Sequence, residues 1–325
     1  MRYKVLIISF LLCLPFWWGA NVLADSLEDF WFVREMTTNP DILNASMNES
    51  ISQLKLTELL TEKAREKRLN EIELKAKSAI VVDLSDDGSS KTIFSKNSGE
   101  KRVIASLTKL MTALVIFDFK ETYNFSETIK IDKDIVDQEG DSKYGNLKIG
   151  DSISVEALTY KMLIESNNDA AYALTKPITE KSFVGLMNHL AEGIGLKNTF
   201  FANATGLDPD SPRDSANTST TEDLAVLSEY ILNNYPKIFY ISSLRNYTVL
   251  NQDGSVHHYI GGNTNELLSE YPEIIGGKTG WTPMAQGCLL EIIKKPDGNG
   301  FYIAVILGSP DRFNDMRQII STLMN

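Results

Sequence analysis

Apolar and polar residues alternate in short segments at both ends of residues 76–325. Segments 79–84 and 92–94 are predicted strands, with Asp87-Gly88 as the turn between them. Later in the chain, the same signals predict strands at 247–250, 274–280, 289–293 and 301–307, turns at 253–254 and 296–299, and a final helix at 311–324. Strands at both ends around a helical middle predict an α/β fold of the α+β type, with one antiparallel sheet of about five strands and helices on its faces.

The middle of the chain has the spacing of helices. Apolar residues follow the i, i+3, i+4, i+7, i+8 pattern of one helix face at Leu107, Leu110, Met111, Leu114 and Val115. This helix is predicted to be largely buried, with Ser106 in its first turn. Further helices are predicted after a cap at Ser154, at 183–190 and at 221–232. Together they would form a helical subdomain beside the sheet.

The first 75 residues differ from the rest. Residues 1–24 have the pattern of an export signal, with a basic start at Arg2 and Lys4 and an apolar core at 5–18. This signal is either cleaved before Asp25 or kept as an anchor. Residues 25–75 are predicted as a charged, partly helical leader, either a spacer from a membrane or a segment without catalytic function. A compact domain is predicted at 76–325, on the extracytoplasmic side of the membrane, in the periplasm or at the cell envelope exterior.

Charge and composition exclude several classes of function. The chain has 325 residues, of which 43% are hydrophobic, and 32 basic against 43 acidic residues. Such an acidic chain repels the phosphates of nucleic acids, so no nucleic acid partner is expected. Cys288 lies in an apolar run and is predicted to be a buried structural thiol. The sequence has no cluster of His or Cys with ligand spacing, so we expect no metal and no cofactor.

Three short motifs follow one another along the chain. Ser106-Leu107-Thr108-Lys109 comes first, Ser166-Asn167-Asn168 starts 60 residues later, and Lys278-Thr279-Gly280 starts 112 residues after that. Each has a structural interpretation of its own: a capped helical turn, a helix cap before residue 169, and a strand with a glycine kink. All three in this order rarely arise by chance, and the set is typical of serine β-lactamases and penicillin-binding proteins.

The residue types suit acyl transfer. A serine hydroxyl attacks efficiently only when a base accepts its proton, and Lys109 would share a helix face with Ser106. A lysine acts as a base only where it is partly neutral, which burial and a neighbouring cation such as Lys278 both favour. Free N–H groups at the helix start suit a developing oxyanion. Gly280 would let a substrate lie close to its strand, and Lys278 with Thr279 suits a carboxylate.

The residues around these motifs resemble those of one family. Segments 104–113, 168–171, 203–207 and 277–282 are similar to the D-alanyl-D-alanine carboxypeptidases, the low-molecular-mass penicillin-binding proteins of the β-lactamase and transpeptidase-like superfamily. The resemblance covers residues 76–325 and implies the fold of DD-peptidases. It also implies the substrate, a peptidoglycan stem peptide ending in D-Ala-D-Ala, and β-lactams as inhibitors that acylate Ser106.

The resemblance also implies a role for each motif residue. Ser106 would attack the carbonyl between the two D-alanines, Lys109 would take its proton, and Ser166 would relay that proton to the leaving D-alanine. Asn168 would hydrogen-bond the substrate amide. The remaining roles fall to the third motif, where the terminal carboxylate would be bound by Lys278 and Thr279. The oxyanion hole would consist of the backbone N–H groups of Ser106 and Trp281.

Other activities are compatible with parts of this pattern. Related short enzymes include endopeptidases that cut D-alanyl cross-links, and the bulky Trp281 beside the oxyanion hole could alter substrate choice. A class A β-lactamase needs a glutamate in an E-x-x-x-N arrangement, which is absent among the acids of 173–217: Glu180, Glu192, Asp208, Asp210 and Asp214. An inactive peptidoglycan-binding protein would have no need of Lys109. About 45 residues follow Lys278, so membrane attachment is expected through the N-terminus only.

Overall fold

The computed structural model describes residues 34, 40–136, 138, 147–211, 213–250 and 256–325. The chain divides into two compact units, Met1–Ala64 and Arg65–Asn325. The predicted export signal at 1–24 and the predicted turn at 253–254 lie outside the described residues. Within the described part of the chain, no helix is both long and apolar enough to cross a bilayer.

The longer helices and strands occur where the hydrophobic pattern predicts them, and the structure adds short elements that the pattern did not predict. The strands are β1 (Ser78–Leu84), β2 (Ser90–Lys96), β3 (Arg102–Val103), β4 (Thr128–Lys130), β5 (Ser152–Ser154), β6 (Thr218–Ser219), β7 (Asn246–Leu250), β8 (Val256–Gly261), β9 (Ile274–Thr282), β10 (Gln286–Lys294) and β11 (Phe301–Ser309). The helices are α2 (Pro40–Glu71), η1 (Ala105–Leu107), α3 (Thr108–Asp118), α4 (Lys133–Val136), α5 (Val155–Ile164), α6 (Asn168–Ala173), α7 (Glu180–Ile194), α8 (Thr221–Asn234), α9 (Lys237–Ser243), η2 (Glu266–Ser269) and α10 (Arg312–Met324).

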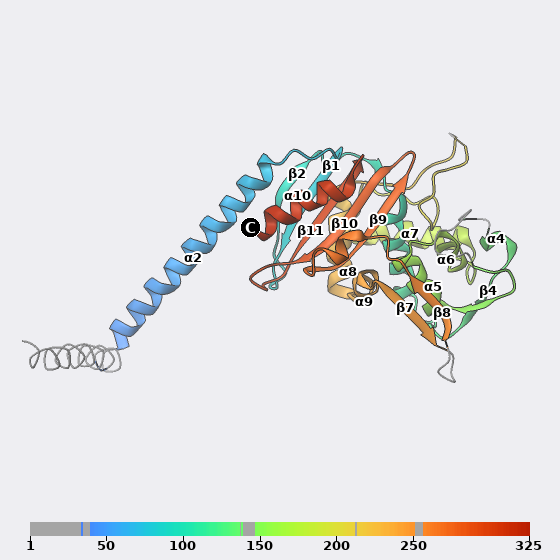
Figure 1. The fold of residues 1–325 in the computed structure, drawn as a ribbon, viewed down its shortest axis with the longest axis horizontal. Coiled ribbons are helices and arrows are strands. Elements are labelled where there is room, and N and C mark those ends of the chain that lie inside the picture. The colour runs from blue at the N-terminus through green and yellow to red at the C-terminus, as the bar shows by residue number, and fades with distance from the viewer. Residues whose placement is uncertain (1–33, 35–39, 137, 139–146, 212, 251–255) are drawn as a thin grey trace, which may run out of the picture. The chain divides into compact units, whose positions relative to one another are not determined.

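The central sheet joins the two ends of the second unit. Its strand order is β2-β1-β11-β10-β9, and every neighbouring pair is antiparallel. Figure 1 shows the early strands β1 and β2 beside the late strands β9, β10 and β11. The predicted antiparallel sheet of about five strands, assembled from both ends, is therefore confirmed. Strand β9, which carries residues 278–280, pairs within this sheet only with β10 and so lies at its edge.

Two hydrophobic clusters cover the two faces of this sheet. Because successive strand residues point to opposite faces, Ile80 and Val82 belong to one cluster and Ala79 and Val81 to the other. The smaller cluster packs against helix α10, and it also includes Leu69, Leu74 and Ala76 just before β1. The larger cluster contains the residues of the helical subdomain. The predicted division at residue 76 stays a prediction.

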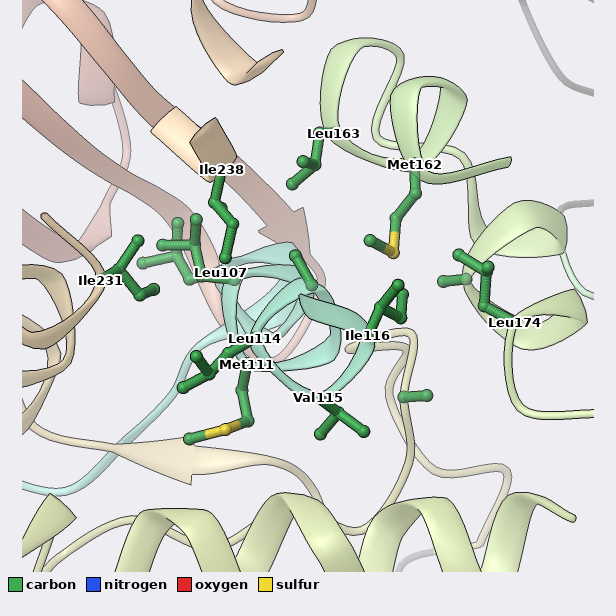
Figure 2. Close-up of a cluster of buried hydrophobic side chains, with 14 of the residues drawn as sticks. Leu107, Met111, Leu114, Val115, Ile116, Met162, Leu163, Leu174, Ile231 and Ile238 are labelled. Carbon is green, nitrogen blue, oxygen red and sulfur yellow. The ribbon is translucent and has the colours of Figure 1, made fainter. Parts of the chain in front are cut away.

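Helix α3 lies inside the larger cluster. All of its residues from 108 to 117 are buried, which is wider than the single face that the spacing of leucines indicated. Figure 2 shows that its side chains point outward in several directions, toward partners from α5, α8 and α9: Met162, Leu163, Ile231 and Ile238. The segment that begins at Ser106 is thus held by packing around its whole circumference.

Candidate active site

The second unit brings the three motifs to one place from separate elements. Ser106 lies in η1, directly before α3, and Lys109 follows in the first turn of α3. Residues 166–168 connect α5 to α6, and residues 278–280 lie in the edge strand β9. Packing of η1 against β9 and of α5 against α6 places these segments around the start of α3.

Lys109 links the first two motifs. Its side chain is 0% exposed. The ammonium donates hydrogen bonds to Ser106 Oγ at 3.0 Å, to Asn168 Oδ1 at 2.6 Å and to the carbonyl oxygen of Thr205 at 2.6 Å. Protonated Lys109 has three N–H donors for these three acceptors, whereas the neutral amine has two donors and a lone pair that can accept the Ser106 proton. The nucleophile candidate therefore has a lysine nitrogen within hydrogen-bonding distance and in a buried position.

Strand β9 lies against the backbone of the nucleophile segment. A Cβ atom added at Gly280 would be 3.0 Å from the Ser106 backbone nitrogen and 3.1 Å from the Ile104 carbonyl oxygen. Only glycine allows this approach without displacing its neighbours. The guanidinium of Arg312 donates to the Gly280 carbonyl at 3.2 Å. Trp281 follows in the same strand and is 62% exposed, beside the nucleophile segment.

The loop before β6 also contacts this segment closely. Gly206 has a φ of +85°, and an added Cβ would be 2.1 Å from the Ala105 carbonyl oxygen. Ala105 itself has a φ of +47°, an uncommon value for a residue with a side chain. The loop continues to Asp208, whose carboxylate accepts hydrogen bonds from Thr282 Oγ1 at 2.7 Å and from the Met284 backbone N–H at 3.0 Å. It therefore connects Ser106 to the end of β9.

Residues 166–168 combine a structural and a site position. Asn167 Oδ1 accepts a hydrogen bond from the Ala170 N–H at 2.8 Å, so the helix-cap interpretation of this motif is confirmed. Asn168, one residue later, contacts Lys109, and the cap therefore does not exclude a role in the site. Ser166 is half-buried and has a φ of +61°, which is typical of strained backbone at functional sites.

Lys278 and Thr279 are both almost fully buried. The Lys278 ammonium donates to the Thr279 carbonyl at 3.2 Å, and Thr279 Oγ1 lies 2.5 Å from Thr264 Oγ1. Sequence reasoning missed Thr264 and the carbonyl of Thr205. Thr264 lies in a segment without periodicity, and a backbone carbonyl has no residue type that could signal it. Only the fold reveals these two contacts.

Cys288 does not belong to the reacting groups. It is fully buried in β10, and burial raises the pKa of its thiol to about 12. A thiol at this pKa is protonated near neutral pH and is a poor nucleophile. The predicted structural role of Cys288 is confirmed.

The chain matches known proteins over most of this unit. A model of the D-alanyl-D-alanine carboxypeptidase family matches residues 62–311. The chain is 32% identical over 247 residues to the D-alanyl-D-alanine carboxypeptidase DacF of Bacillus subtilis, in an alignment that covers 75% of this chain and 60% of that relative. It is 31% identical over 223 residues to the D-alanyl-D-alanine endopeptidase of Escherichia coli, with 67% of each chain covered.

A solved structure has a similar fold. Penicillin-binding protein D2 of Listeria monocytogenes, in its cefotaxime-bound form, has a TM-score of 0.64 and 27% identity, over 78% of this chain and 99% of that chain. The fold predicted from the three motifs is thus confirmed. Since the family match extends over more than half of its residues, the chain belongs to the D-alanyl-D-alanine carboxypeptidase family.

Proposed function

We propose that this protein is a serine D-alanyl-D-alanine carboxypeptidase that removes the terminal D-alanine from peptidoglycan stem peptides. The observation that carries the proposal is the 3.0 Å hydrogen bond between the Lys109 ammonium and Ser106 Oγ, in a site closed to solvent at the lysine. A non-enzymatic binding protein has no use for a buried lysine at a serine hydroxyl, because burying a charge is costly.

The reaction has two steps. Ser106 Oγ attacks the carbonyl carbon between the two D-alanines while its proton passes to a neutral Lys109. The negative oxygen of the tetrahedral intermediate accepts hydrogen bonds from the backbone N–H groups of Ser106 and Trp281. The C–N bond then breaks, and the leaving D-alanine amine receives a proton through Ser166. Water cleaves the resulting ester and regenerates Ser106.

The polar groups of the third motif, on the strand that lies against the nucleophile segment, fit the end of such a substrate. Lys278 supplies a positive charge for the terminal carboxylate, and Thr279 supplies a hydroxyl. Thr264 adds a second hydroxyl, 2.5 Å from that of Thr279. Asn168 lies beside Lys109 and would hydrogen-bond the substrate amide. A carboxylate held here would set the scissile carbonyl in register with Ser106.

Two further properties belong to this proposal. A relative of similar fold binds cefotaxime, and we expect β-lactams to acylate Ser106 in the same way that the stem peptide does. The substrate lies outside the cytoplasmic membrane, so we place the enzyme in the periplasm or at the exterior of the envelope, exported by residues 1–24.

A second candidate activity is the cleavage of D-alanyl cross-links. The E. coli relative is a D-alanyl-D-alanine endopeptidase, and the 62% exposed Trp281 offers an apolar surface beside the nucleophile segment for a larger, cross-linked substrate. In this case Ser106 and Lys109 keep their roles, and the leaving group is the amine of a second stem peptide.

Mass spectrometry of a pentapeptide ending in D-Ala-D-Ala, incubated with the full chain, tests the assignment. We expect loss of one D-alanine, and no loss with Ser106→Ala. If the pentapeptide stays intact while a cross-linked dimer is cut, the endopeptidase is correct. If neither substrate changes, the protein is not a DD-peptidase.

A further inference from the structure

A buried ion pair lies at the end of α5, next to the second motif. Lys161 Nζ is 2.5 Å from Glu165 Oε2, and both side chains are only 2% exposed. An ion pair at this depth usually stabilises a fold no better than an apolar pair of similar volume, because both charges lose their hydration. Stability alone therefore gives little reason for these two residues, and the other contacts of Glu165 show what the pair holds in place.

The second oxygen of Glu165 holds a distant segment. Glu165 Oε1 accepts a hydrogen bond from the backbone N–H of Gly261, the last residue of β8, at 3.0 Å. Three residues later, the N–H of Thr264 donates to the Ile164 carbonyl at 3.2 Å. The end of α5 thus fixes both ends of the short loop 261–264 by two hydrogen bonds. The partners of these bonds are 96 and 100 residues apart in sequence.

This loop delivers a hydroxyl to the third motif. Thr264 Oγ1 lies 2.5 Å from Thr279 Oγ1, the hydroxyl assigned above to the substrate carboxylate. Glu165 also directly precedes Ser166 in the chain. Ser166 lies just after the end of α5 and has a φ of +61°. One carboxylate therefore lies between the loop that carries Ser166 and the loop that carries Thr264.

We propose that Glu165, oriented by Lys161, is a positioning residue that sets the carboxylate-binding pair Thr264 and Thr279 relative to Ser166. The two oxygens of Glu165 have different partners: Lys161 fixes the side chain, and Gly261 transmits its position to the loop. This inference rests on the proposed function, because it assigns to the loop the recognition of a free C-terminal carboxylate. Its consequence is selectivity for substrates that carry this carboxylate.

Three double variants of the full chain separate the contacts. Lys161→Met/Glu165→Leu removes both charges and the acceptor for Gly261, and it keeps the volume and an apolar interior. Lys161→Met/Glu165→Gln also removes both charges, but it keeps an oxygen that can accept from Gly261. The matched control is Asp83→Leu/Lys295→Met, which removes another ion pair of low exposure. Lys295 follows Leu290 by five residues, and Leu290 of β10 pairs with Lys278 of β9.

The measurement is kcat/KM for a pentapeptide ending in D-Ala-D-Ala and for its C-terminal amide, which has no carboxylate. For Lys161→Met/Glu165→Leu we expect a loss of about 10- to 100-fold with the acid, mainly through KM, and a much smaller loss with the amide, because a displaced loop weakens only carboxylate binding. Lys161→Met/Glu165→Gln should restore only part of the preference for the acid, because it keeps an acceptor for Gly261 but lacks the ammonium that orients the side chain. The control should keep it.

The outcomes are distinct for each idea. Equal losses with acid and amide, or an unchanged preference in Lys161→Met/Glu165→Leu, would overturn the positioning role. If the unmodified protein cleaves neither peptide, the proposed function itself is wrong. Thermal unfolding checks that each variant folds. If Lys161→Met/Glu165→Leu does not fold, Lys161→Ala/Glu165→Ala removes the same acceptor without added bulk, and its acid-to-amide preference decides the question by the same criteria.

Discussion

Helix α3 has two buried parts that are stabilised in different ways. Lys109, in its first turn, is 0% exposed and donates three hydrogen bonds, whereas Leu114, five residues later, is 1% exposed and has hydrophobic neighbours. Removing an ammonium from water costs free energy that hydrogen bonds only partly offset, whereas burying a leucine contributes about 1.5–3 kcal/mol. Equal burial therefore has opposite energetic consequences: burial of the body of α3 stabilises the fold, whereas burial of Lys109 costs free energy and is explained by the catalytic role proposed above.

The largest expected effect comes from changing the first turn. Lys109→Met should lower turnover of the D-Ala-D-Ala pentapeptide by about 10²- to 10⁴-fold, because no base remains for Ser106. Relief from burying a charge offsets the lost hydrogen bonds, so the free energy of unfolding should change by no more than about 2 kcal/mol. Steady-state kinetics and urea unfolding measure the two quantities. An active Lys109→Met enzyme would show that the base lies elsewhere.

A change in the body of the helix should have the opposite signature. Leu114→Ala leaves a cavity among the side chains shown in Figure 2 and should lower the free energy of unfolding by about 2–5 kcal/mol. Turnover per folded molecule should fall less than about tenfold, because the hydrogen bonds of Lys109 stay in place. The same two measurements apply. If turnover of the folded fraction fell as far as in Lys109→Met, the division of α3 into two parts would be wrong.

Glu291 provides a further case of a buried ionisable group, with a smaller expected effect. It lies in β10 opposite Gly277, is fully buried, and accepts a hydrogen bond from the Asn265 side chain at 2.8 Å. Burial raises the pKa of the Glu291 carboxyl well above its usual range, although the Asn265 hydrogen bond and the charge of Lys278 act to lower it. The folded protein therefore holds this proton more tightly than the unfolded chain does.

The sign of the resulting pH dependence follows from this difference. Above the usual glutamate pKa, the unfolded chain binds fewer protons, so the free energy of unfolding falls as pH rises, by up to about 1.4 kcal/mol per pH unit for this one group. Glu291→Gln has no such proton, and its stability relative to the unchanged protein should increase from about pH 5 to about pH 8. Urea unfolding at both pH values measures this difference in the free energy of unfolding between Glu291→Gln and the unchanged protein. The same difference at pH 5 and at pH 8 would contradict a raised pKa for Glu291.

Much of the fold could be predicted because local patterns agree with it. Apolar runs bounded by turn residues predicted β1, β2, β10 and β11, and the Ser154 cap is confirmed by the hydrogen bond that its side chain accepts from the Ala157 N–H at 3.1 Å. The predicted burial of α3 is also confirmed, but over all its faces. Its surroundings come from helices distant in sequence, which no pattern within the segment can specify.

The sequence by itself determined which residues could react, because Ser106, Lys109, Ser166, Asn168 and 278–280 are defined by type and spacing. Only the tertiary structure decided which groups surround them. The Thr205 carbonyl at Lys109, the Thr264 hydroxyl at Thr279 and the Glu165 carboxylate at Gly261 depend on contacts across 96, 15 and 96 residues. Such contacts form when sheet and helices pack together. They depend on the direction of the backbone and on where loops begin and end, and neither produces a periodic pattern of residues in the sequence.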